Sequence, residues 1–248
     1  MDQMVNLKLR SQEISYDENG CRYWKPLEND MSYDPSELAI VIMDMWDDHW
    51  AKGAALRCAK LAPKIDKVVR RAREAGVFIV HGPSDTIDFY KDSPARKRAL
   101  DIDVIAPDVE VDIPDYPMPV DGSDGGSDTN DEHPVHTPLW TRQDKNIFID
   151  ESKDIISDEG DIVYSHFKKR GIKRIIYLGV HTNMCILHRS FAIKPMLRRG
   201  MECVLVRDLT DALYNPARPP YVNQAEGTQL VVGFIEKFYC PTIDSTNI

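Results

Sequence analysis

The chain has 248 residues, of which 42% are hydrophobic and 29% charged, an ordinary balance for a single soluble α/β domain. Its formal net charge is −9, so the surface repels phosphate backbones and anionic membranes, and no nucleic-acid partner is expected. No apolar run approaches the roughly 20 residues of a membrane span, and the first residues lack a signal-peptide pattern, so we expect a cytoplasmic protein.

The cysteines predict a reducing environment. There are five, at wide spacings and without a C-x-x-C pair. Disulfide frameworks are typical of short secreted chains, and structural zinc sites use closely spaced cysteine pairs. We therefore expect free thiols, most of them buried, at Cys21, Cys58, Cys185, Cys203 and Cys240.

The first half of the chain begins with a polar segment and then alternates between strand and helix. Residues 1–36 predict an irregular N-terminal extension that packs on the domain. Residues 37–44 are a short apolar run, typical of a strand buried on both faces. Residues 52–76 have helical spacing and end on a glycine, and residues 77–82 predict a second buried strand. A strand, a helix and a strand in this order indicate parallel pairing with a right-handed crossover.

The second half of the domain, which we place at residues 37–248, repeats this alternation. We therefore predict a three-layer α/β/α fold, in which helices cover both faces of a doubly wound, mainly parallel sheet. The expected elements are a helix at 155–171, a strand at 172–180, a helix at 183–200 kinked by Pro195, a strand at 201–208 and a helix at 223–238.

One long segment interrupts the alternation. Residues 103–146 are rich in proline, glycine and aspartate, and they have too few apolar residues to form a core of their own. A loop of this length in a compact domain is usually a functional lid or a disordered insertion. Within it, residues 121–128 faintly resemble a calcium loop but lack its closing glutamate, so we interpret them as a flexible acidic turn.

Reactive side chains follow several of the predicted strands. Asp44, His81 and Asp208 end three strands, and Cys185 lies near the start of a helix that follows another. Ligands bind beyond the carboxyl ends of the strands in an open parallel sheet, so these residues are candidates for a site.

Cys185 is the strongest candidate. A helix N-terminus favours a thiolate and offers free N–H groups, so Cys185 could be a nucleophile beside an oxyanion site. The alternative is a buried structural cysteine. Asp44 could equally be a helix cap or a surface acid of the loop.

Two motifs resemble those of the isochorismatase-like cysteine hydrolases. IVIMDMWDDHW, residues 40–50, is similar to the family's first strand, which ends in aspartate. GVHTNMC, residues 179–185, is similar to the loop that carries the nucleophilic cysteine. The order of elements extends the resemblance over residues 37–240.

The resemblance implies a catalytic triad of Asp44, Lys153 and Cys185. Lys153 has Ser157 four residues later, at the family's spacing, and Lys145 is the competing lysine. The resemblance also implies a cis peptide bond before His181, so that the backbone N–H groups of His181 and Cys185 form an oxyanion hole.

The implied reaction is hydrolysis of a small-molecule amide through a thioester, without a cofactor. Two alternatives remain open: cleavage of a vinyl ether, as in some family members, and a catalytically silent binding protein. The family also implies a homodimer or homotetramer. Four aromatic residues could line the pocket and stack on a substrate: Trp46, His49, Trp50 and Trp140.

A metal site is not expected. The metal-binding members of the family carry an Asp-x-His pair after the second strand, and this chain has none there. It offers only His81 and Asp85, whereas a catalytic zinc site needs three protein ligands.

Overall fold

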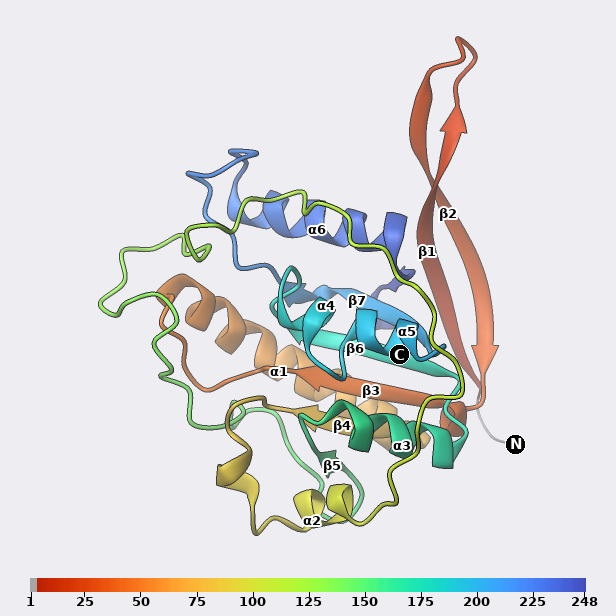
Figure 1. Ribbon diagram of the computed structural model, residues 1–248, viewed down its shortest axis with the longest axis vertical. Helices are drawn as coiled ribbons and strands as arrows, with labels where there is room; N and C mark the ends of the chain where they lie inside the picture. The colour runs from red at the N-terminus through yellow and green to blue at the C-terminus, as the bar shows by residue number, and fades with distance from the viewer. Residues whose placement is uncertain (1–3) are drawn as a thin grey trace.

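An eight-stranded sheet forms the centre of the computed structural model, which describes residues 4–248 (Figure 1). The strand order is β2-β1-β8-β7-β6-β3-β4-β5. The six strands from β8 to β5 in this order pair in parallel, and the chain builds them outward from β3 in both directions. They are β3 (Leu38–Met43), β4 (Phe78–Gly82), β5 (Ile155–Ile156), β6 (Arg174–Val180), β7 (Glu202–Asp211) and β8 (Thr242–Ile243).

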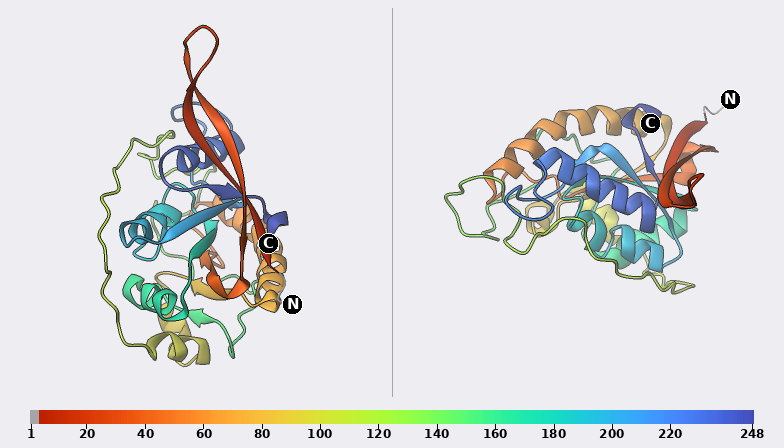
Figure 2. Two further views of the ribbon diagram at one scale, coloured as in Figure 1. Left: turned by 90° about the vertical axis from the view of Figure 1, so that its right-hand side faces the viewer. Right: turned by 90° about the horizontal axis from the view of Figure 1, so that it is seen from above.

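Helices cover both faces of this sheet, which confirms the predicted three-layer α/β/α fold. Alternate residues of β3 belong to two separate cores: Ala39 and Val41 face one, Leu38 and Ile40 the other. The long helix α1 (Lys52–Ala75) covers one face alone (Figure 2). The opposite face is covered by α3 (Gly160–Arg170), α4 (Cys185–His188), α5 (Ile193–Arg198) and α6 (Gln224–Phe238).

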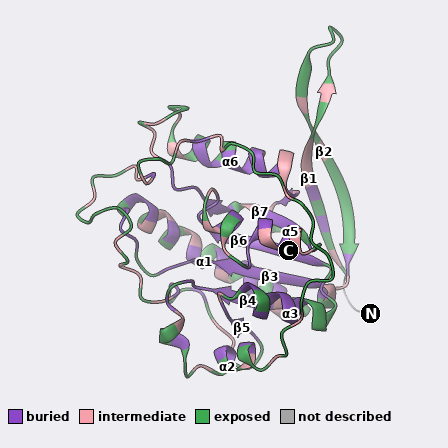
Figure 3. Ribbon diagram, viewed as in Figure 1, coloured by how far each residue is buried: buried purple, intermediate pink, exposed green. Residues whose placement is uncertain are grey.

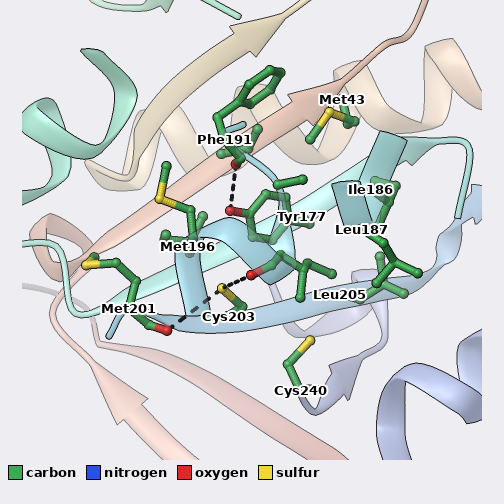
Figure 4. Packing of buried hydrophobic residues seen from close by; sticks show 14 of the residues in the cluster. Met43, Tyr177, Ile186, Leu187, Phe191, Met196, Met201, Cys203, Leu205 and Cys240 are labelled. Carbon is green, nitrogen blue, oxygen red and sulfur yellow. Dashed lines mark hydrogen bonds between the residues drawn. The ribbon is translucent and has the colours of Figure 1, made fainter. Parts of the chain in front are cut away.

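The core under α4 and α5 supports the loop that carries the candidate nucleophile. Tyr177 of β6 is fully buried, and its hydroxyl donates a hydrogen bond of 2.9 Å to the Phe191 carbonyl between the two helices (Figure 4). Ile186 and Leu187 of α4 are buried in the same cluster. Side chains of this size each contribute roughly 1.5–3 kcal/mol when buried, so the position of α4 is firmly determined.

Two predicted helices are wrong in their bounds. The segment 155–171 begins as strand β5, and helix α3 starts only at Gly160, because Ile155 and Ile156 pair with β4. The segment 183–200 is two short helices, interrupted after His188. Pro195 lies in the first turn of α5, where its missing N–H costs nothing, so it helps to start a helix and does not kink one.

The expectation of an irregular N-terminal segment is also wrong. Strands β1 (Val5–Tyr16) and β2 (Arg22–Tyr33) form a long hairpin, and β1 joins the sheet edge where Arg10 pairs with Thr242. The far half of this hairpin stands away from the domain and is exposed on both faces (Figures 1 and 3). The far half of the hairpin is exposed on both faces and therefore has no alternating apolar pattern. The start of β1 does alternate, with Val5, Leu7 and Leu9 between polar residues, and our expectation overlooked that signal.

The segment 103–146 contains no helix and no strand longer than the single bridge between Gln143 and Trp46. It crosses the helices on one side of the molecule as an extended strap (Figure 2). The short helix α2 (Pro94–Leu100) precedes it. Within residues 4–248, no helix is long and apolar enough to cross a membrane.

Candidate active site

The candidate site lies where the carboxyl ends of β3, β4 and β6 meet. Asp44 follows β3 directly, and its backbone has a φ of 45°, which turns the chain sharply out of the sheet. Its N–H donates to the Gly82 carbonyl at the end of β4, at 3.0 Å. Cys185 comes five residues after the end of β6. Asp44 and Cys185, 141 positions apart in the chain, are therefore brought to one edge by the parallel pairing of β3 with β6.

The Asp44 carboxylate is fully buried and accepts two hydrogen bonds. One comes from the Ser84 backbone N–H at 2.8 Å, and the other from Arg189 Nε at 3.0 Å. Burial raises the pKa of Asp44 above its usual range, while the Arg189 charge and the hydrogen bonds to the carboxylate oppose that rise.

The Cys185 thiol lies within hydrogen-bonding reach of the Asp44 carboxylate, and its side chain is partly exposed. Burial and then the negative charge of Asp44 raise the thiol pKa, whereas Arg189 and the His181 backbone N–H lower it. Burial and the Asp44 charge thus outweigh the lowering of the thiol pKa that we expected from a helix N-terminus. The thiol is therefore protonated at neutral pH and needs a base.

The loop before Cys185 contains one feature that the resemblance implies, a cis peptide bond. The Val180–His181 peptide bond is cis. The His181 N–H lies close enough to the Cys185 sulfur to lower the thiol pKa. The N–H groups of Met184 and Ile186 both donate to the His181 carbonyl, at 3.0 and 3.3 Å. The Cys185 N–H lies between these two groups in the sequence. Within the described residues it donates to no loop carbonyl and to no side chain.

The structure does not bring Lys153 to this site. Lys153 is exposed and lines a hollow together with Gly76 and Phe78, at the amino end of β4. Because β5 runs parallel to β4, the residues just before β5 lie at the edge of the sheet opposite Cys185. Lys145 is also exposed and forms no ion pair within residues 4–248. The basic group beside Asp44 is instead Arg189, which the sequence analysis missed.

The four predicted aromatic residues do gather beside the site. Trp46 stacks on Trp140 of the strap, with ring centroids 4.6 Å apart, and His49 stacks on Trp140 at 5.5 Å. Trp50 lies 5.3 Å from His49. His181 meets the His49 ring edge-on at 5.0 Å, which connects this aromatic cluster to the cysteine loop.

Three buried polar atoms in this region have no partner within the described residues: Ser84 Oγ, Trp140 Nε1 and His181 Nε2. Burial lowers the pKa of His49 to about 4 and that of His181 well below its usual range, so both imidazoles are neutral at physiological pH. Such groups are available to a bound water or ligand. A cavity of about 280 Å³ borders the cysteine loop and is lined by Asn183, Met184, Leu213 and strap residues between Met118 and His136.

The two weak metal candidates have other partners. His81 is buried, with one ring nitrogen 2.9 Å from Gln143 Oε1 and the other 3.0 Å from Asp154 Oδ2. Asp85 forms a salt bridge of 2.7 Å with Arg189. Residues 4–248 contain no group of three or more His, Cys, Asp or Glu side chains that could hold a metal ion.

Solved structures with the same architecture belong to the isochorismatase-like hydrolases. A cysteine hydrolase from Pseudomonas syringae pv. phaseolicola matches 86% of this chain over 91% of its own, with a TM-score of 0.53 and 16% identity. An isochorismatase from Pseudomonas putida matches 87% of this chain over 92% of its own, with a TM-score of 0.51 and 11% identity. No protein-family model and no curated protein matches the sequence. The chain thus has an isochorismatase-like fold, and at this identity the likeness concerns the fold.

Proposed function

We propose that this protein is a hydrolase that cleaves the C–N bond of a small-molecule amide, with Cys185 as the nucleophile and Asp44 as the base. One observation carries the proposal: the thiol faces both a buried carboxylate and the His181 backbone N–H. A nucleophile, a base in contact with it and an oxyanion donor are the groups that acyl transfer requires.

The reaction follows from this arrangement. Asp44 takes the thiol proton, and the sulfur attacks the carbonyl carbon of the substrate. The negative oxygen of the tetrahedral intermediate accepts hydrogen bonds from the N–H groups of His181 and Cys185. The C–N bond then breaks as Asp44 gives its proton to the departing amine.

The second half of the reaction restores the enzyme. Asp44 takes a proton from water, whose oxygen attacks the thioester carbon. The C–S bond breaks, the acid is released, and the proton returns from Asp44 to the sulfur. Asp44 thus serves both steps as acid and base. A carboxyl group with a raised pKa suits this role better than an exposed carboxyl group with an ordinary pKa. Trp140, which stacks on the buried Trp46, provides a flat surface for the substrate beside the site.

The test is detection of the acyl-enzyme. The protein is incubated with a panel of small primary and secondary amides, and intact mass and released amine are measured. We expect an acyl adduct on Cys185 in the wild type, no adduct in Cys185→Ala, and turnover about 10²–10⁴-fold lower in Asp44→Asn.

Cys21→Ser is the matched control, because Cys21 is an exposed thiol at the hairpin turn, far from the site. Substrate turnover that survives in Cys185→Ala would refute the cysteine mechanism and favour an isochorismatase-type hydrolase that works without the cysteine. Binding of amides without turnover in any variant would favour a binding protein.

A further inference from the structure

The positive charge beside the nucleophile comes from an unexpected residue. We infer that Arg189, held in place by Asp85, fulfils the role that the resemblance assigns to a lysine: it is the fixed cation of the Asp44–Cys185 pair. This inference rests on the proposed function, because it concerns the same nucleophile and base.

Arg189 is placed at the site by its position at the end of α4. It is the C-cap residue of this helix, four positions after Cys185, and its backbone N–H donates to the Cys185 carbonyl at 3.2 Å. Residues four apart lie on the same side of a helical turn. The helix that presents the thiol therefore presents the guanidinium on the same side, toward Asp44.

The guanidinium is held from two directions. Its Nε donates to Asp44 Oδ2 at 3.0 Å, and its Nη2 donates to Asp85 Oδ2 at 2.7 Å. Its centre lies 6.0 Å from the centroid of the Trp46 ring. A planar guanidinium group that is hydrogen-bonded through two nitrogens has little conformational freedom left, so its charge stays in place during a reaction. Asp85 is thus a positioning residue, which acts through Arg189.

The fully buried Asp44 carboxylate needs such a partner. A buried charge without a counter-charge is expensive, and Arg189 is the basic residue that pairs with Asp44 within residues 4–248. Its charge lowers the pKa of both Asp44 and Cys185, against the effect of burial. A further ionisable group near Asp44 is the buried Cys58 thiol of α1, whose pKa is raised to about 12. Arginine stays charged at every relevant pH, so Arg189 acts as a fixed charge and not as an acid.

This role predicts a specific change in the titration of the pair. Asp44 and Cys185 exchange a proton, so their first ionisation belongs to both groups together. Loss of a neighbouring positive charge makes that ionisation harder. The acid limb of Cys185 reactivity, which is the rising low-pH part of the plot of rate against pH, should therefore move to higher pH. A mere loosening of the structure would lower the reactivity without moving this limb.

The experiment measures the rate at which Cys185 reacts with a pyridyl disulfide from about pH 4 to about pH 11, with peptide mass spectrometry to identify the thiol. In Arg189→Gln the acid limb should move up by about one pKa unit or more, which is about tenfold slower reaction at a given pH on that limb. Arg189→Lys keeps the charge and should keep the limb close to that of the wild type. Lys153→Met removes an exposed charge at the far edge of the sheet and should change nothing.

A second pair of variants repeats the comparison without an unpaired buried carboxylate. In the Asp44→Asn background, Arg189→Gln should again raise the apparent pKa of the thiol by about one unit. If Cys185 is reactive but Arg189→Gln shifts its titration neither in the wild type nor in the Asp44→Asn background, the inference is overturned and the proposed function still stands. A Cys185 thiol that is inert in the wild type and indifferent to Asp44→Asn would instead refute the proposed function itself.

Discussion

At the scale of single residues, the site combines deep burial with a small number of compensating contacts. Asp44 is fully buried, and it has one backbone donor and one arginine. His49 and His181 are buried as well, and burial lowers the pKa of both. A carboxyl group with a raised pKa can give its proton back to a leaving group. Because both imidazoles are neutral, neither places a positive charge beside the oxyanion site.

The titration of His49 predicts how stability depends on pH. Its folded pKa is about 4 and its unfolded pKa about 6.5. The unfolded state therefore takes up a proton first as the pH falls, and stability present above pH 6.5 is lost progressively toward pH 4. For His49 alone, we expect the free energy of unfolding to fall by about 2 kcal/mol between pH 7 and pH 5.

Urea unfolding at both pH values checks this prediction. His49→Gln keeps an acceptor for the Ala51 N–H and should reduce the pH dependence by about that amount. His181 contributes in the same direction, so part of the dependence should remain. The same change at the exposed His133 is the control. Equal pH dependence in all three proteins would contradict the burial of a neutral His49.

At the scale of elements, the site depends on the close approach of β3 and β6. Gly179 pairs with Met43, has a φ of 109°, and leaves no room for a side chain: a Cβ there would lie 2.2 Å from the Met43 carbonyl oxygen. A backbone atom cannot move aside as a flexible side chain can. This glycine therefore permits the spacing at which Asp44 and the cysteine loop meet.

Gly179→Ala should separate these two strands. We expect a loss of roughly 2–5 kcal/mol in the free energy of unfolding, because backbone strain and overpacking act together, and a large loss of activity. Gly171→Ala is a matched control, because Gly171 has a φ of 69° but nothing within 4 Å of a Cβ. It should cost only about 1 kcal/mol. Equal losses in the two variants would show that the contact with Met43 is unimportant.

At the scale of the whole molecule, the strap connects distant parts of the fold. Arg57 of α1 binds Asp128 of the strap at 2.7 Å and Asp211 at the end of β7 at 2.9 Å. Farther along the strap, Trp140 covers Trp46 beside the site. The strap therefore carries one wall of the site, although it has no core of its own.

Loss of the Asp128 contact should loosen the strap while the domain stays folded. In Asp128→Asn we expect cleavage by a non-specific protease within residues 121–137 to become several-fold faster, with a change of about 1 kcal/mol or less in the free energy of unfolding. The exposed Asp108, which pairs with Lys168, is the control position for the same substitution. Unchanged cleavage in Asp128→Asn would mean that the strap is held elsewhere.

The buried strands, the layers and the candidate base and nucleophile could be predicted from the sequence. Strands covered on both faces are continuous apolar runs, so β3, β4, β6 and the start of β7 stand out, and the residues that follow them must meet at one edge. The hairpin did not stand out, because β2 is exposed along most of its length and contains Pro26, which an edge strand tolerates.

The sequence by itself therefore determined the fold class and the meeting of Asp44 with the Cys185 loop, because both follow from periodicity and strand order. Only the tertiary structure decided which cation joins them. Lys153 matched a spacing in the chain but lies at the opposite edge of the sheet, whereas Arg189 binds a carboxylate 145 positions away. Spacing along a chain constrains neighbours in one element, but a contact between side chains on different elements depends on how the layers pack and where each helix ends.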